Sequence, residues 1–184
     1  KNMDYTKSVY SETKQMNRLI VSFLQYNRLQ KIQHLEKTKC DMKEIIPEEL
    51  EKYEDLFEAA GIQCEVSMEE TELINGNKEL LALVIDNYLS NAYKYTEGGR
   101  MITVKLTREK KGCRFVVWNE GAQLIEDDMT QIWDILSRQD KSRNREKGST
   151  GMGLPICRRI LELHGFAYGC GHKDNGAEFW FEAK

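Results

Sequence analysis

Long apolar runs are missing from this chain of 184 residues. The longest uninterrupted one, Leu80 to Ile85, covers six residues. A membrane-spanning helix needs about 20. No signal peptide is recognisable either. The sequence therefore predicts a soluble chain, and leaves open a membrane segment upstream of it.

The chain also lacks Cys-x-x-Cys spacing and a net positive charge. The five cysteines are an odd number without Cys-x-x-Cys spacing, which favours scattered, reduced thiols in a cytosolic protein. The formal net charge is −3, so no broad basic surface argues for nucleic acid as a partner. With 40% apolar and 31% charged residues, the composition fits a soluble globular domain that carries a long exposed helix.

Glycine and proline are absent from residues 4–33, where apolar residues recur every three or four positions: Val9, Met16, Leu19, Ile20, Phe23 and Tyr26. This spacing predicts a long amphipathic helix. A lone helix with one apolar stripe needs a partner, so a helical hairpin or a dimeric bundle is favoured over a helix that folds back on its own domain.

The rest of the chain alternates between helical and strand-like segments. We expect helices over residues 47–60 (opened by Pro47 and closed by Gly61), 77–96, near 129–136, and 152–164. We expect strands over 40–45, 62–68, 72–75, 101–106, 113–118, 166–172 and 177–182. The fold class predicted is α+β, a two-layer sandwich in which three helices cover one face of a mixed, mostly antiparallel sheet. Residues 1–36 and 37–184 form the two expected domains.

An unusual polar face marks the predicted helix 77–96. Each helical residue turns the chain by about 100°, so Asn87, Asn91, Lys94 and Tyr95 share roughly one quadrant. A carboxamide oxygen can ligate Mg²⁺ without repelling phosphates, an ammonium neutralises them, and an aromatic ring stacks on a base. Surface amides on a solvated face are the simpler alternative. The pattern favours a nucleotide site.

Two further segments fit such a site. The run Gly148-Ser-Thr-Gly-Met-Gly-Leu154 offers backbone N–H groups to an anion and leads into a helix N-terminus, because Pro155 is tolerated only in a first turn. The run Trp118-Asn-Glu-Gly121 ends an apolar strand, where a polar side chain can accept a hydrogen bond from an exocyclic amine. Neither a Walker A nor a Rossmann fingerprint is present.

The order Asn-x-x-x-Asn-Ala-x-Lys-Tyr, then a strand ending before x-x-Gly, then Gly-x-x-Gly-x-Gly-Leu resembles the catalytic ATP-binding domain of bacterial sensor histidine kinases. That domain belongs to the superfamily that includes Hsp90-like ATPases. The similarity covers nearly the whole chain, and residues 4–33 resemble the second helix of the family's dimerisation and phosphoacceptor hairpin.

The resemblance implies the following roles in binding MgATP. Asn91 would coordinate magnesium, Asn87 would support it as a catalytic residue, and Arg138, in a lid between Gly121 and Gly148, would reach the γ-phosphate. The other expected nucleotide contacts are Lys94, Tyr95, Asn119, Gly121, Thr150, Gly151, Met152, Gly153 and Leu154. Hydrolytic relatives place a glutamate where Asn87 stands, and an amide cannot activate water, so phosphotransfer is favoured over hydrolysis.

The chain departs from the family in three places. Asn119 replaces the aspartate that reads adenine; its oxygen still accepts a hydrogen bond, but the loss of charge weakens that bond by about 1 kcal/mol. Leu136 and Ser137 stand near positions where the family's lid usually carries Phe and Tyr. No histidine lies in a phosphoacceptor sequence, and we interpret His34, His164 and His172 as structural.

The leading hypothesis is therefore the ATP-binding and transfer portion of a two-component sensor kinase, a cytoplasmic domain of an inner-membrane-anchored bacterial sensor. It would pass the γ-phosphoryl group to a histidine outside this chain, and thence to a response regulator, as a homodimer through the N-terminal helix. The alternative is a nucleotide-binding or dimerising module that has lost catalysis. An ATPase is disfavoured by Asn87.

Overall fold

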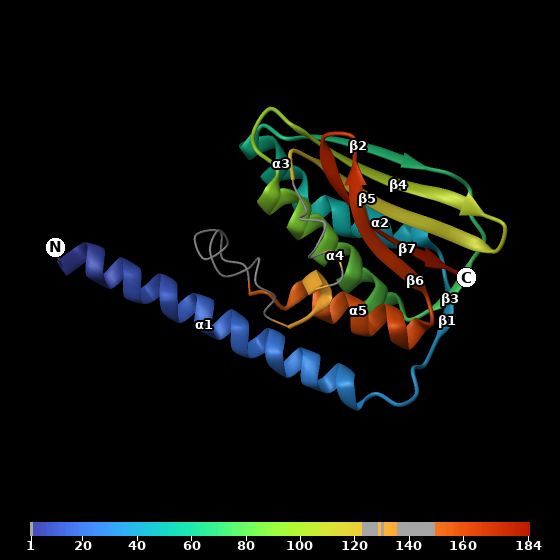
Figure 1. Cartoon of the computed structure of the whole chain (residues 1–184), viewed down its shortest axis with the longest axis horizontal. Coiled ribbons are helices and arrows are strands. Elements are labelled where there is room, and N and C mark those ends of the chain that lie inside the picture. Colours follow the sequence, from blue (N-terminus) through green and yellow to red (C-terminus); the bar gives the residue numbers. More distant parts are fainter. Residues whose placement is uncertain (1, 123–128, 130, 136–149) are drawn as a thin grey trace.

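The computed structural model describes residues 2–122, 129, 131–135 and 150–184. Arg138, Leu136 and Ser137 lie outside the described residues. Helix α1 (Asn2–Lys31) forms as the spacing predicts, and its N-terminal part extends away from the rest of the molecule (Figure 1). Its C-terminal end lies against α5 (Gly153–His164), where the Arg159 guanidinium donates to the carbonyls of Leu29 and Ile32. No helix among the described residues has both the length and the apolar character that a bilayer crossing requires.

The segment that follows α1 corrects two predictions. Strand β1 (Thr38–Cys40) is short, and helix α2 (Met42–Leu50) occupies most of the predicted strand 40–45. The Asp41 side chain accepts from the backbone N–H of Lys43 at 2.8 Å and caps α2. The helix therefore starts before Pro47, which lies inside it, and not at Pro47 as predicted.

Proline inside α2 is tolerated because only one helical hydrogen bond is lost with its N–H. Its own carbonyl still accepts from the backbone N–H of Glu51. The predicted single helix 47–60 is divided by a 3₁₀ turn, η1 (Glu51–Tyr53), and continues as α3 (Glu54–Ala60). Gly61 closes α3 at a φ of 65°, as its position predicts.

Five strands form the main sheet of the described chain, in the order β2-β4-β5-β7-β6. They are β2 (Gln63–Met68), β4 (Met101–Glu109), β5 (Gly112–Glu120), β6 (Ala167–Lys173) and β7 (Gly176–Ala183). The pairing of β2 with β4 is parallel, and the other three pairings are antiparallel. This confirms the mixed, mostly antiparallel sheet. A separate antiparallel pair joins β1 to β3 (Ile74–Gly76), which overlaps the predicted strand 72–75 only in part.

Helices α2, α4 (Lys78–Tyr95) and α5 cover one face of the sheet, which confirms the two-layer sandwich (Figure 1). The centre of the core is aromatic. The Tyr88 ring on α4 stacks at 6.5 Å between centroids on Phe115 of β5 and meets Phe179 of β7 at 5.7 Å. Tyr88 is fully buried, so α4 is fixed directly against the middle of the sheet.

The described part of segment 129–136 contains a 3₁₀ turn, η3 (Gln131–Trp133), in place of the predicted short helix. Ile132 and Trp133 are buried, and the Trp133 ring meets Tyr168 edge-on at 5.0 Å. These two apolar side chains anchor η3 beside the sheet and α5.

Candidate nucleotide-binding site

Helix α4 divides into an apolar side and a polar side. The Asn77 side chain caps the helix by accepting from the backbone N–H of Leu80 at 3.1 Å. Six residues are buried, namely Leu81, Val84, Ile85, Tyr88, Leu89 and Ala92. The predicted site residues Asn87, Asn91, Lys94 and Tyr95 are all partly buried. The helix thus packs on one side and leaves polar groups on the other, as the sequence predicts.

Asn87 lies directly against the N-terminus of α5. Its Nδ2 donates to the carbonyl oxygen of Leu83 at 2.8 Å, one turn back along α4. A Cβ atom added at Gly153 would lie only 2.6 Å from Oδ1 of Asn87. Two motifs separated by more than sixty residues therefore meet here, and only glycine leaves room for the carboxamide.

Asp86, next to Asn87, is held from a third element. The Tyr53 hydroxyl donates to Oδ1 of Asp86 at 2.8 Å. Burial raises the pKa of Tyr53 well above its ordinary value, and the nearby Asp86 raises it further, so the phenol remains a donor. This contact fixes the start of the polar face of α4 against η1.

The glycine loop ends at a helix N-terminus suited to an anion. Gly151 has a φ of 65°, and Oγ1 of Thr150 accepts from the backbone N–H of Met152 at 3.4 Å. No side chain of the described residues caps α5. Its first turn presents the N–H groups of Gly153 and Leu154 at the positive end of the helix dipole. This is the arrangement that binds phosphate oxygens.

Asn119 lies at the end of β5, on the sheet face that the helices cover. It is opposite Ile102 of β4 and Ala177 of β7, and both of these residues are fully buried. The side chain of Asn119 is only 3% exposed, and its Nδ2 has no hydrogen-bond partner among the described residues. A buried donor of this kind costs stability unless a ligand takes it up.

The C-terminal end of α4 reaches the same edge of the sheet. Tyr88 lies over Phe115, and one helical turn advances about as far as two strand residues. Thr96 lies about two helical turns beyond Tyr88, and Asn119 lies four residues beyond Phe115 on β5. Thr96 and Asn119 are therefore at the same end of the sheet. The hydroxyl of Thr96 is also buried without a partner among the described residues. Sequence analysis did not identify Thr96.

Glu120 fixes the strand end and was likewise missed. Its Oε2 accepts from the backbone N–H of Met101 at 3.1 Å, and its Oε1 accepts from Nδ2 of Asn175 at 2.8 Å. The carbonyl of Asn175 accepts from the backbone N–H of Gly121, also at 2.8 Å. Its position between the predicted site residues Asn119 and Gly121 could have indicated Glu120. It was not selected because a carboxylate repels phosphates and is not expected to contact a nucleotide.

The structure thus brings Asn87 against Gly153 and places the loop from Thr150 to Leu154 at the N-terminus of α5. Asn119 and the C-terminal turn of α4, which holds Tyr95, lie at one edge of the sheet. Gly121 is exposed, and a Cβ there would collide with the Arg100 guanidinium, so glycine is needed at its φ of 81°.

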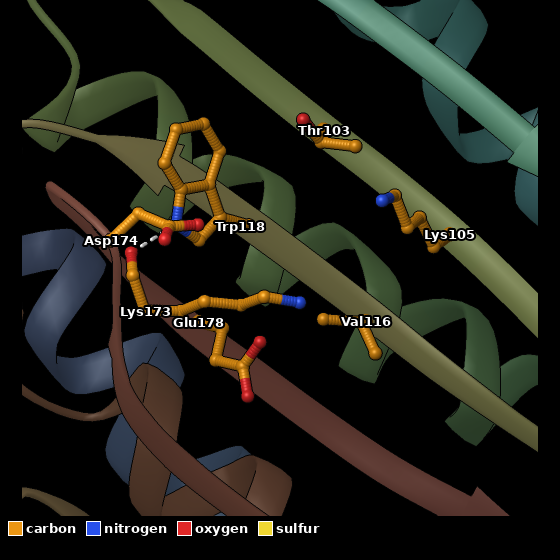
Figure 2. A pocket seen from close by; sticks show the side chains of 7 residues that line it. All are labelled: Thr103, Lys105, Val116, Trp118, Lys173, Asp174 and Glu178. Carbon is orange, nitrogen blue, oxygen red and sulfur yellow. Dashed lines mark hydrogen bonds between the residues drawn. The ribbon is translucent and has the colours of Figure 1, made fainter.

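A small cavity on the other face of the sheet contains none of the predicted site residues. Figure 2 shows its lining, with the Trp118 indole and the Lys105 side chain on neighbouring strands. Its volume is about 150 Å³. The indole N–H of Trp118 donates to the carbonyl of Lys173 at 2.9 Å, which joins β5 to the end of β6. No group of three or more potential metal ligands from His, Cys, Asp and Glu occurs in the described parts of the chain.

Comparison with known proteins agrees with this geometry. The sensor histidine kinase YcbM of Bacillus subtilis is 27% identical over 156 residues, which cover 84% of this chain and 50% of YcbM. The chain therefore spans half the length of this relative. Full-length ShkA, solved in complex with AMPPNP, superposes with a TM-score of 0.81 at 23% identity and covers 98% of this chain and 38% of ShkA. Histidine kinase ThkA, solved in complex with response regulator protein TrrA, gives a TM-score of 0.80 at 23% identity over 97% of this chain and 50% of that one.

The two solved structures show that the fold is shared, long N-terminal helix included. The family match is more specific, because it begins at the glycine before α4 and ends with the last strand. Residues 76–184 match the profile described as histidine kinase-, DNA gyrase B-, and HSP90-like ATPase. Since this is more than half of its length, the chain belongs to that family.

Proposed function

We propose that this chain is the ATP-binding catalytic portion of a sensor histidine kinase, which transfers the γ-phosphoryl group of MgATP to a histidine. The contact between Asn87 and Gly153 is the observation that carries this proposal. It places a neutral carboxamide, held by Leu83, at the junction of α4 and the glycine loop. An amide cannot deprotonate water, so the junction positions phosphate without activating a hydrolytic nucleophile.

The residues present fit a bound nucleotide. The N–H groups of Gly153 and Leu154 would hold phosphate oxygens at the start of α5. Asn91 would supply one neutral oxygen to magnesium, which keeps most of its water ligands. Lys94 would offset phosphate charge, Tyr95 would pack on the base, and the buried carboxamide of Asn119 would meet the base edge. Bound MgATP supplies the phosphoryl group and the electrophilic phosphorus.

None of the three histidines lies in a phosphoacceptor sequence, and His164 is also inaccessible. His164 is only 5% exposed, its Nε2 accepts from the backbone N–H of Asn77 at 3.0 Å, and its Nδ1 is bonded to the carbonyl of Ile160. His34 follows the C-terminal end of α1, and His172 is exposed on β6. We therefore assign the acceptor histidine to a hairpin segment outside this sequence, with residues 1–36 as the partial hairpin and 37–184 as the catalytic domain.

Helix α1 supports homodimerisation as part of this proposal. Its exposed apolar side chains include Met16 at 60%, Ile20 at 53% and Phe23 at 52%. Leu29, near its C-terminal end, is buried against the domain. A long helix with one apolar side already packed and another uncovered is suited to a helical bundle. The second copy of the chain would supply the remaining helices.

A response-regulator receiver domain is the proposed acceptor downstream. The support is the likeness to ThkA, which was solved with its response regulator. We further propose that the chain works as a cytoplasmic domain of a membrane-anchored sensor.

A transfer assay tests the proposal directly. The chain is mixed with a separately supplied helical hairpin that carries a phosphoacceptor histidine, together with γ-labelled ATP and Mg²⁺. We expect label on that histidine, and a loss of about 100-fold or more in rate for Asn91→Ala, since misplacing a reacting group by about 1 Å costs that much. Asn75→Ala, an exposed amide on β3, serves as the matched control.

Two other outcomes would contradict transfer. Tight ATP binding without labelled histidine would identify a nucleotide-binding or dimerising module that has lost catalysis. Steady release of inorganic phosphate without labelled histidine would identify an ATPase and would overturn the interpretation of Asn87.

A further inference from the structure

We propose that Asn119 makes the base site accept guanine as well as adenine nucleotides. This inference rests on the proposed nucleotide-binding function and adds the class of base to it. Its first support is the burial of Asn119 at 3% exposure, with Nδ2 unpartnered among the described residues. A buried amide with an unused donor is a group to which a bound ligand can supply a hydrogen-bond partner.

The surroundings of Asn119 leave its carboxamide to the ligand. Across the sheet it faces Ile102 and Ala177, and two residues back on its own strand is Val117, which is also buried. None of these side chains can donate or accept a hydrogen bond. The backbone groups of β4, β5 and β7 are already engaged in the sheet. Any hydrogen-bond partner of the Asn119 carboxamide therefore has to lie outside the sheet.

The strand end is fixed, so the carboxamide cannot leave the site by moving the backbone. Glu120 bridges the backbone of Met101 and the side chain of Asn175, and Gly121 donates to the carbonyl of Asn175. The remaining freedom is rotation of the Asn119 side chain about χ1 and about its terminal torsion, χ2. That torsion is broad and roughly two-fold, so a half-turn exchanges the donor and the acceptor.

This exchange is what separates a carboxamide from a carboxylate. Adenine presents an amine donor and a ring-nitrogen acceptor on its Watson–Crick edge, whereas guanine presents a carbonyl acceptor, a ring N–H donor and, further along, an amine donor. A carboxamide offers one donor group and one acceptor, and can complement either edge. A carboxylate only accepts. In the proposed pose, in which the substituent at position 6 of the base faces residue 119, it accepts from the adenine amine but meets the guanine carbonyl with like partial charge in a buried place.

Binding measurements on three forms of the chain test the proposal. Titration calorimetry with ATP and with GTP, each with Mg²⁺, gives the two dissociation constants for the native chain, Asn119→Asp and Asn119→Ala. We expect the native chain to bind ATP and GTP within about 10-fold of one another. We expect Asn119→Asp to bind ATP several-fold tighter and GTP about 100-fold weaker, because a charged acceptor strengthens one pairing and an unmatched buried group penalises the other.

Asn119→Ala removes the donor and the acceptor together, so both affinities should fall by a similar factor and the preference should stay small. Asn75→Asp makes the same charge change on an exposed residue and should leave both constants as in the native chain. Thermal unfolding of each variant establishes that it is folded.

A native chain that rejects GTP as strongly as Asn119→Asp does would overturn this inference and leave the proposed function standing. A folded native chain that binds neither nucleotide would overturn both. The readout is equilibrium binding, so the result is independent of phosphotransfer.

Discussion

Gly153 is the residue on which the candidate site depends most directly. Oδ1 of Asn87 leaves no space for a methyl group at Gly153, since a Cβ added there would lie 2.6 Å from that oxygen. Asn87 cannot simply swing away, because its Nδ2 is bonded to Leu83 on the same helix. Any side chain at this position has to displace either the carboxamide or the first turn of α5.

Gly153→Ala is therefore expected to weaken MgATP binding by about 10-fold or more, as a displacement of site groups by a few tenths of an ångström to 1 Å is costly. Titration calorimetry measures this effect. Gly171→Ala on β6 is the matched control, because a Cβ there would meet nothing within 4 Å. Equal affinities for the two variants would show that the junction does not hold the nucleotide.

His164 is a second residue with a defined task, and that task depends on its charge. Burial lowers the pKa of His164 below its ordinary value of 6.5, although the bond to Ile160 opposes this and nearby Lys37 adds to it. The neutral ring uses Nε2 to accept from Asn77, which caps α4. Protonation of Nε2 would remove that acceptor and disturb the start of the helix that carries the site.

The sign of the pH effect follows from this direction. Below about pH 6.5 the unfolded chain binds a proton at His164 that the folded chain does not, so the free energy of unfolding falls as pH is lowered through that region. Urea titrations at pH 7.5 and pH 5.5 measure it. His164→Gln should be less stable at pH 7.5 and should lose part of the pH dependence, whereas His34→Gln, at an exposed position, should retain it.

At the scale of elements, α1 has two different sides. Toward its C-terminus it is fastened to α5, where Arg159 donates to the carbonyls of Leu29 and Ile32. These carbonyls belong to the last turn and the residue after it, where helical hydrogen bonds run out. The Leu29 carbonyl also accepts from the backbone N–H of Ile32 at 3.3 Å. Met16, Ile20 and Phe23 form an exposed apolar stripe, which another helix would cover in the proposed dimer.

Ile20→Glu should therefore weaken self-association of the chain by roughly 10- to 100-fold, the equivalent of about 1.5–3 kcal/mol for burying one such side chain. Sedimentation equilibrium over a range of concentrations gives the dissociation constant. Arg18→Glu is the control. It changes the charge by more than Ile20→Glu does, but Arg18 is exposed and lies nearly half a turn around the helix from Ile20. If both variants associate as the native chain does, the apolar stripe is not the dimer interface.

At the scale of the whole molecule, the site joins elements that are far apart in sequence. Helix α4 and the start of α5 meet at Asn87 and Gly153. The end of β5 is fixed by the first residue of β4 and by a residue between β6 and β7. A ligand that bridges these parts binds the folded chain and not the unfolded one, so it stabilises the entire domain.

Saturating MgATP should consequently raise the unfolding temperature. At 100 times the dissociation constant the gain is about 2.7 kcal/mol, or roughly 5–10 °C for a chain of this size. Differential scanning calorimetry with ATP and Mg²⁺, and again with ATP and EDTA, separates the two contributions. If Asn91 ligates magnesium, EDTA should remove most of the shift in the native chain and change little in Asn91→Ala.

The sequence by itself determined the main elements and indicated the candidate members of the site. Apolar spacing located α1 and α4, alternation located β2, β4, β5, β6 and β7, and the polar quartet with the glycine loop indicated a nucleotide. These features are local, since a period of 3.6 or 2 residues is written in the chain wherever one side is buried. The same reasoning failed at Pro47, because the cap at Asp41 outweighed the usual preference of proline for a first turn.

Only the tertiary structure decided what depends on distant residues. The contact of Gly153 with Asn87 and the hydrogen bonds of Glu120 join segments that sequence spacing cannot bring together. The burial of Asn119 opposite Ile102 and Ala177, with no partner for its Nδ2 among the described residues, likewise depends on neighbouring strands. Burial takes the Asn119 carboxamide away from bulk solvent, so a bound ligand can supply the hydrogen bond that the described residues do not. The burial of Asn119, on which the proposed recognition of the base rests, follows from the packing of the sheet.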